Sequence, residues 1–153
     1  LEGMDYLEKR VAYYKEVAIN EKTILARAQN VGILKLKVAL KLCAVGPTAR
    51  ASGINMDIRR DDPHASYAEI PFDVITTDTC DVLGRVVVRI LELLESIKII
   101  RYLMEHLPAG EIVVKVPRKV PEGESISHTE APRGEDLHYL RSSPDSEDQV
   151  GRK

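Results

Sequence analysis

The most constraining feature of this sequence is a long stretch in which aliphatic residues recur every seven positions. Between residues 79 and 107, two series share this spacing: Leu83, Ile90, Ile97 and Met104, and Val86, Leu93, Ile100 and Leu107. Such spacing places both series along one seam of an α-helix. We therefore predict one long helix in the core of a helical bundle, with Asp78 or Thr79 as its N-cap and Pro108 and Gly110 ending it.

The charges of this stretch argue against a membrane span. Arg85, Glu92 and Arg101 are among the charged residues that interrupt it, and no apolar run approaches the roughly 18 residues that a spanning helix requires. The formal net charge of −2 also argues against binding to nucleic acid or a membrane surface by electrostatics. We expect a chain that neither inserts directly into a membrane nor binds nucleic acid.

Other segments complete a prediction of the fold. Apolar spacing indicates helices over residues 2–19, 21–29 and 35–42. A strand is expected over residues 111–116, and a hairpin is expected to pair residues 126–133 with residues 136–141. The predicted fold class is mainly α (α+β), a helical bundle with one long central helix and a small β-hairpin near the C-terminus. We expect a single domain over residues 1–141 and a flexible polar tail over residues 142–153.

The segment 44–72 breaks the helical periodicity and is predicted to be a long loop, which is often functional. Its stretch from Gly46 to Gly53 only superficially resembles a phosphate-binding loop, because it lacks the Gly-Lys-Ser/Thr ending. The glycines are expected instead to permit a tight turn and a close approach by a neighbouring backbone. The mixed charges from Asp57 to Asp62 fit a surface network of mutual pairs, with a partner interface as the alternative.

Arg133 stands between Pro132, which fixes its own φ, and Gly134, which frees the backbone that follows. A guanidinium held in this way is always charged and offers five donors in a rigid fork. It is suited to an anionic or electron-rich ligand. A solvated arginine in a polar β-turn is the simpler alternative.

An ordered series of motifs makes the first interpretation the stronger one. The series is Gly46-Pro-Thr-Ala-Arg-Ala-Ser-Gly53, Asp57-x-Arg59, Pro63, Tyr67, Phe72-Asp73 and Glu130-Ala-Pro-Arg-Gly134. It resembles the large-subunit family shared by membrane-bound energy-converting [NiFe]-hydrogenases and the 49-kilodalton-type subunit of NADH:quinone oxidoreductase, respiratory complex I. The likeness covers roughly residues 20–141, and the first half is common to both branches. His138, five positions after Arg133, favours the hydrogenase branch, because complex I subunits usually carry an aliphatic residue there.

The resemblance implies roles for individual residues. Arg133 matches the catalytic arginine that lies over the nickel–iron centre, near the cyanide ligands of the iron. Pro132, Glu130 and His138 are expected around it, with Pro132 in the dry wall and His138 orienting the cysteine environment. A further set is expected to form a structural or partner-contacting loop: Gly46, Arg50, Gly53, Asp57 and Arg59.

The cysteines depart from the hydrogenase pattern, in which two C-x-x-C pairs hold the nickel. Cys43 and Cys80 lie far apart and neither belongs to such a pair, so we expect two reduced thiols and no metal site in this chain. The resemblance implies a [NiFe] centre only for a longer, full-length subunit, or a quinone if the chain belongs to the complex I branch. We expect the chain to be a central fragment of such a subunit, inactive alone.

The first hypothesis is therefore the catalytic large subunit of an energy-converting hydrogenase. The alternative is the complex I subunit, in which the same scaffold lines a quinone pocket, and a second alternative is a non-catalytic scaffold. The resemblance implies an iron–sulfur small subunit and membrane subunits as partners, and a peripheral position on the cytoplasmic face of the membrane. Leu- and Ile-rich faces left uncovered are expected to permit self-association of the fragment.

Overall fold

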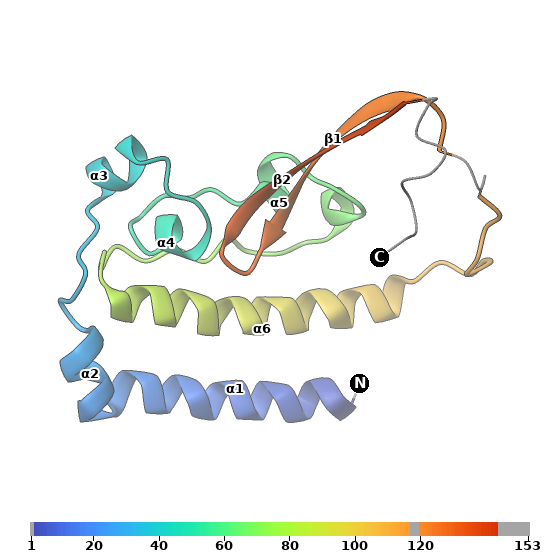
Figure 1. Ribbon diagram of the computed structural model, residues 1–153. Helices are drawn as coiled ribbons and strands as arrows, with labels where there is room; N and C mark the ends of the chain where they lie inside the picture. Colours follow the sequence, from blue (N-terminus) through green and yellow to red (C-terminus); the bar gives the residue numbers. More distant parts are fainter. Residues whose placement is uncertain (1, 117–119, 144–153) are drawn as a thin grey trace, which may run out of the picture.

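A computed structural model describes residues 2–116 and 120–143 and consists mainly of helices (Figure 1). The elements are α1 (Glu2–Asn20), α2 (Lys22–Ala28), α3 (Leu36–Lys41), α4 (Gly46–Arg50), α5 (Ile58–Asp61), the 3₁₀ helix η1 (Tyr67–Glu69), α6 (Val82–His106), β1 (Gly123–Ala131) and β2 (Gly134–Ser142). The predicted fold class is confirmed. The three helices predicted before residue 43 agree with α1, α2 and α3 to within one residue at each end.

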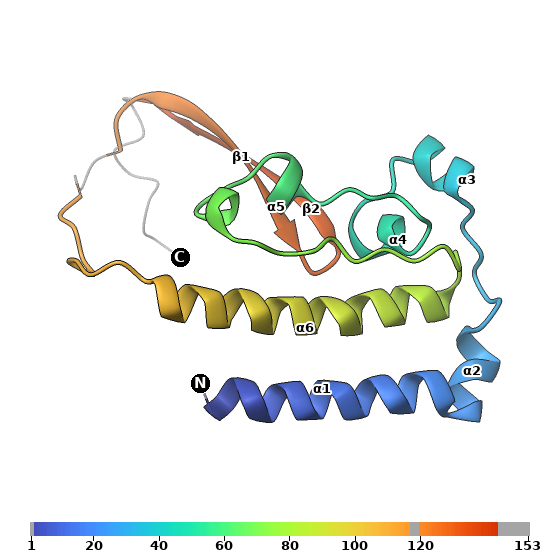
Figure 2. The same cartoon turned by 180° about the vertical axis from the view of Figure 1, so that it is seen from behind.

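The two longest helices, α1 and α6, lie side by side and run in opposite directions (Figures 1 and 2). Val11 and Ala18 are the buried residues of α1. At the other end of the pair, Arg101 of α6 donates to the carboxylates of Asp5 and Glu8 at 2.5 and 2.7 Å. This ion pair fixes the C-terminal part of α6 against the beginning of α1. On its other side α6 faces α4 and the β-hairpin.

The N-cap of α6 is Asp81, so the prediction of Asp78 or Thr79 is wrong by two or three residues. One Asp81 oxygen accepts from the Gly84 N–H and the other from the Asn30 N–H, each at 2.8 Å. Cys80 has a positive φ of 61° and exchanges backbone hydrogen bonds with the preceding loops. The chain therefore turns at Cys80, and the helix starts only after this turn.

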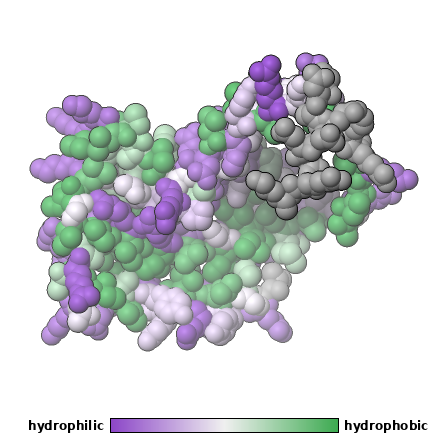
Figure 3. All heavy atoms as spheres, viewed as in Figure 1, coloured by the Kyte–Doolittle hydropathy of each residue, from purple (hydrophilic) through white to green (hydrophobic). Residues whose placement is uncertain are grey.

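The face of α6 that packs differs from the predicted seam. Ile97 is buried at 5% exposure, but Leu93, Ile100 and Met104 of the same seam are 52, 40 and 61% exposed. The helix is covered on two sides, by α1 and by α4, so its buried residues do not follow a single stripe. Figure 3 shows exposed hydrophobic side chains over α3 and along α6.

The segment predicted as a loop, residues 44–72, contains three short helical turns, α4, α5 and η1. The strand predicted over residues 111–116 is wrong, because these residues are irregular and exposed, with Ile112 fully accessible. A strand needs a partner, and β1 of the described chain pairs with β2 alone. The polar tail expected after Ser142 lies, from residue 144 onwards, outside the described residues.

The predicted hairpin is confirmed as β1 and β2, paired antiparallel from Gly123–Ser142 to Ala131–Gly134, although β1 ends two residues before the predicted residue 133. Pro132 and Arg133 form the two-residue turn. This turn lies beside α4 and above α6 (Figures 1 and 2). Within residues 2–116 and 120–143, a helix long and apolar enough to cross a membrane is not found.

Candidate functional site

The two glycine-containing motifs meet at the turn of the hairpin. Gly46 has a φ of 62°, and a Cβ added there would lie 2.3 Å from the Cα of Gly134. Gly134 is buried, has a φ of 131°, and an added Cβ would lie 2.8 Å from the backbone nitrogen of Gly46. The close approach predicted for the glycine loop is therefore made by Gly46. Gly53 also has a positive φ, 83°, but faces open space.

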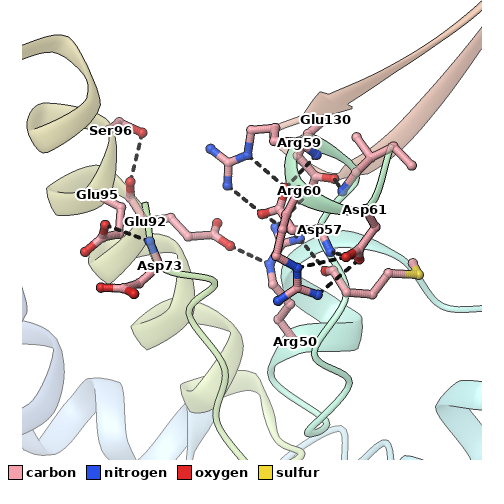
Figure 4. A network of polar contacts seen from close by, with 12 residues as sticks. Arg50, Asp57, Arg59, Arg60, Asp61, Asp73, Glu92, Glu95, Ser96 and Glu130 are labelled. Atoms are coloured by element: carbon pink, nitrogen blue, oxygen red, sulfur yellow. Dashed lines mark hydrogen bonds and ion pairs between the residues drawn. The ribbon is translucent and has the colours of Figure 1, made fainter. Parts of the chain in front are cut away.

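The buried side chain of Arg50 pairs with carboxylates from several elements (Figure 4). Its side chain is only 2% exposed. Its Nε donates to Glu92 at 2.6 Å and one terminal nitrogen donates to Glu130 at 2.8 Å. The other terminal nitrogen lies 3.5 Å from Asp57 and donates to the carbonyl of Met56 at 3.1 Å. One guanidinium thus joins α4, the start of α5, α6 and β1.

The mixed charges between residues 57 and 62 pair with one another, as predicted, but only part of the network is at the surface. Asp57 is 1% exposed and receives two side-chain bonds from Arg59, at 2.9 and 2.6 Å. Arg60 pairs with Asp61 at 2.8 Å on the exposed side. Burial alone would raise the pKa of Asp57, but the hydrogen bonds and charge of Arg59, with the charge of Arg50, hold it below its ordinary value.

Arg59 is held by aromatic rings as well as by Asp57. Its guanidinium carbon lies 5.9 Å from the ring centre of Tyr67 and 5.0 Å from that of Phe72. The two rings meet edge to face at 6.0 Å. Its bonds to Asp57 raise the pKa of Arg59, so that it stays charged at any ordinary pH. Tyr67 and Phe72 of the sequence motifs therefore act together on one arginine.

These groups surround a cavity of about 770 Å³ between α6 and the hairpin turn. From α6 it is lined by Arg89, Glu92, Leu93 and Ser96. The opposite wall consists of Arg50, Arg59 and Tyr67, and the hairpin supplies the segment 130–133. A cavity of this size fits a small organic ligand, and its wall combines arginines with apolar surface.

Sequence reasoning missed the contribution of α6. Arg89, Glu92 and Ser96 are spaced so that they share one face of the helix, interrupting its aliphatic pattern. That interruption was the available signal, but by itself it argues only against a membrane span. Burial raises the pKa of Glu92, and the charge and hydrogen bond of Arg50 offset this only in part.

The predicted site residues do not all reach the cavity. Arg133, Pro132 and Glu130 line it, although the side chains of Arg133 and Pro132 remain exposed. Glu130 anchors the turn through Arg50 and through a longer contact of 3.5 Å from the Ile58 N–H. His138 is exposed on β2, paired in register with Ser127, and is absent from the cavity wall.

The residues present do not fit a [NiFe] centre. Cys43 and Cys80 are free and neither lines the cavity. Within residues 2–116 and 120–143, no three His, Cys, Asp or Glu side chains are grouped to hold a metal ion. The soft thiolate ligands that nickel needs are missing from this wall.

Comparison with known proteins identifies relatives of the chain. Residues 1–120 match the family described as "Respiratory-chain NADH dehydrogenase, 49 Kd subunit". Relatives named as subunits of NADH-quinone oxidoreductase include one from Dehalococcoides mccartyi, 40% identical over 91% of this chain, and one from Desulfitobacterium hafniense, 36% identical over 92%. The chain spans 38% of the length of each of these two relatives.

A solved structure shares the fold of this chain. A chain of the membrane-bound sulfane sulfur reductase, described as an archaeal respiratory membrane complex, superposes with a TM-score of 0.82 and 31% identity. The match covers 92% of this chain and 40% of the other. The names of the curated relatives support the quinone-linked alternative better than the hydrogenase hypothesis. The hydrogenase hypothesis is supported only in that the two kinds of subunit belong to related families.

Proposed function

This chain belongs to the family of the 49-kilodalton subunit of respiratory-chain NADH dehydrogenase, and we propose that it is the ligand-binding part of a subunit in a quinone-reducing respiratory complex. The observation that carries the proposal is the meeting of the two motifs around one cavity that Arg133 lines. The sequences of the relatives support the quinone-linked branch. The family model that matches residues 1–120 supports it over the hydrogenase branch as well.

The ligand we propose is the head group of a quinone. Its carbonyl oxygens accept hydrogen bonds, and their electron density increases on reduction, which a fixed guanidinium stabilises. Arg89 and Arg133 line the cavity, and among the described residues neither is paired with a carboxylate. Pro132 and Leu93 supply apolar surface for the ring.

The proposed partners follow from this chemistry. Electrons must come from outside the chain, and we propose an iron–sulfur small subunit as their source. Membrane subunits would hold the complex, and this chain with it, on the cytoplasmic face of the membrane. The relatives are named as subunits of an oxidoreductase and the structural neighbour belongs to a respiratory membrane complex, which supports partner subunits in general.

The test is Arg133→Lys in the complete subunit, assembled in its complex. A lysine keeps the charge but loses the planar fork, so we expect quinone reduction to fall by about 10-fold or more, roughly 1.4 kcal/mol, with assembly unchanged. Arg141→Lys, an exposed arginine of β2 outside the cavity, is the matched control and should leave turnover unchanged. Equal turnover of the two variants would contradict the proposal, and hydrogen uptake by the purified complex would support the hydrogenase branch.

A further inference from the structure

The buried charges beside the cavity do not balance. The cluster contains two guanidinium groups, Arg50 and Arg59, and three carboxylates, Asp57, Glu92 and Glu130. With all five groups ionised the formal charge of this ion-paired cluster is −1, and the two further arginines of the cavity wall, Arg89 and Arg133, are exposed and lie outside it. The most exposed side chain of the cluster is Glu92, at 18%. Because a net charge is costly in a partly dehydrated site, one carboxylate is favoured to carry a proton.

The contacts of the three carboxylates identify which one. Asp57 accepts three bonds from Arg59, two from its side chain and one from its backbone. Glu130 uses both oxygens, toward Arg50 and the Ile58 N–H. Glu92 makes a single side-chain bond, from Arg50 to its Oε1, and within the described residues its second oxygen accepts none. Glu92 is therefore the carboxylate whose second oxygen is available for a proton.

Glu92 and Glu130 are the two carboxylates of the cluster that line the cavity, and Glu92 has the more exposed side chain, 18 against 6%. Glu92 lies on the cavity wall, on the same helix face as Ser96 (Figure 4), and Arg89 of that helix also lines the cavity. Tyr67 and Arg133 approach from the opposite wall and the hairpin turn. The hydroxyl of Ser96 donates to the backbone carbonyl of Glu92 at 2.8 Å and so leaves the carboxylate free.

The charges that face Glu92 act in both directions. Burial raises its pKa, and the positive charges of Arg50 and Arg59 lower it, while the negative charge of Asp57 raises it again. The net result is a raised pKa in the presence of two cations. This direction agrees with the charge count and with the geometry.

We propose that Glu92 is the proton-exchanging residue of the cavity. It takes a proton from solvent on Oε2 and passes it to a ligand oxygen that has become basic on receiving an electron from an iron–sulfur partner. In that step the O–H bond of Glu92 breaks, an O–H bond forms on the ligand, and the carboxylate left behind stays paired with Arg50. The identity of the ligand rests on the proposed function, but protonation of Glu92 does not.

The first test follows the carboxyl carbon of Glu92 by ¹³C NMR in this 153-residue chain as pH is varied. Through-bond correlation to the backbone of Glu92 assigns the signal in the wild-type chain, so the result does not depend on a variant that folds. Glu92→Gln should remove the signal, and Glu105→Gln, an exposed position on the same helix, should not. We expect a midpoint above the roughly 4.3 of an exposed glutamate, and a midpoint at or below it would overturn the proposal.

The second test measures quinone reduction by the assembled complex. Glu92→Gln should lower kcat by about 100-fold or more while KM changes little, because a general acid is lost but Arg133 still holds the ligand. Glu92→Asp should recover part of the rate with an altered pH profile. An unchanged kcat and pH profile in Glu92→Gln would overturn proton delivery. The NMR titration does not involve quinone. It therefore distinguishes a failure of the quinone assignment from a failure of the protonation of Glu92.

Discussion

At the scale of single residues, Arg50 is the group on which the buried charge around the cavity depends. Its guanidinium contacts Glu92, Glu130 and Asp57, and it is almost completely buried. Replacing it by alanine leaves three carboxylates close together without their shared cation. We expect Arg50→Ala to lower the free energy of unfolding by about 3–5 kcal/mol, measured by denaturant unfolding.

Arg60 provides the matched control for this prediction. It also pairs with a carboxylate, that of Asp61, but the two side chains are 42 and 38% exposed. Exposed pairs contribute about 0–1 kcal/mol, so Arg60→Ala should have little effect. Similar losses in the two arginine variants would show that the buried cluster is not the source of the stability.

The motif that contains Arg50 was visible in the sequence, but the role of Arg50 was not. Its partners Asp57, Glu92 and Glu130 come from three separate segments of the chain. Local pattern identifies an arginine in a loop and says nothing about which distant carboxylates fold against it. The role of Glu92 was hidden for the same reason, because a glutamate on a long helix is usually a solvated residue.

At the scale of elements, the start of α6 depends on the ionised carboxylate of Asp81. Burial would raise its pKa, but the N–H groups of Gly84 and Asn30 lower it below the ordinary value of about 3.9. A lowered pKa contributes stability at higher pH, which is lost as pH falls from the ordinary value through the folded one. Asp81→Asn keeps an acceptor oxygen but does not titrate. We expect the stability advantage of the wild type over this variant to shrink on acidification below about pH 4.

Unfolding curves at a series of pH values test this prediction. Asp78→Asn is the control, because Asp78 precedes the cap and is exposed. A wild-type advantage over Asp81→Asn that stays constant between neutral and acid pH would rule out the proposed titration. If Asp78→Asn alone disrupted α6, Asp78 would be the N-cap, as the sequence pattern predicts.

The face of α6 that packs gives a second prediction at this scale. Ile97 is buried, whereas Ile100, in the same predicted seam, is 40% exposed. Ile97→Asp places an unpaired charge in the core and should cost about 3–5 kcal/mol of unfolding free energy, whereas Ile100→Asp should cost under about 1 kcal/mol. Thermal or denaturant melts of the two variants provide the measurement, and equal losses would support the single seam instead.

Periodicity located α6 accurately but could not determine its buried face. The sevenfold pattern assumes one partner, while α1 and α4 cover this helix from two sides. The strand predicted over residues 111–116 failed for a related reason. Its residues have β propensity, but a strand forms only where another strand pairs with it, and that depends on the fold as a whole.

At the scale of the whole molecule, two backbone motifs that are distant in the sequence are joined by a contact between Gly46 and Gly134. The resemblance predicted a catalytic role for Arg133 and a structural or partner-contacting role for the loop that contains Gly46. Their physical contact, through Gly46 and Gly134, could not be derived from the residues alone. It positions the hairpin turn, and with it Arg133, against α4 and at the cavity.

A comparison of Gly46→Ala with Gly53→Ala tests this contact. Both positions have a positive φ, which costs an alanine about 1–2 kcal/mol. Only at Gly46 would the new methyl meet backbone, 2.3 Å from the Cα of Gly134 and 2.6 Å from the carbonyl oxygen of Arg133, while Gly53 faces open space. We therefore expect Gly46→Ala to lose a further 1–3 kcal/mol or so of unfolding free energy.

The two variants separate backbone strain from the joining of the motifs. Gly53→Ala carries only the strain, so the difference between the variants measures the close approach. NMR shifts of the hairpin amides give an independent measure, because displacement of the turn should move the signals around Arg133 in Gly46→Ala and leave them in place in Gly53→Ala. Equal losses of stability with unmoved hairpin signals would mean that the Gly46–Gly134 contact does not hold the turn, and that the placement of Arg133 at the cavity depends on the pair of Arg50 and Glu130 instead.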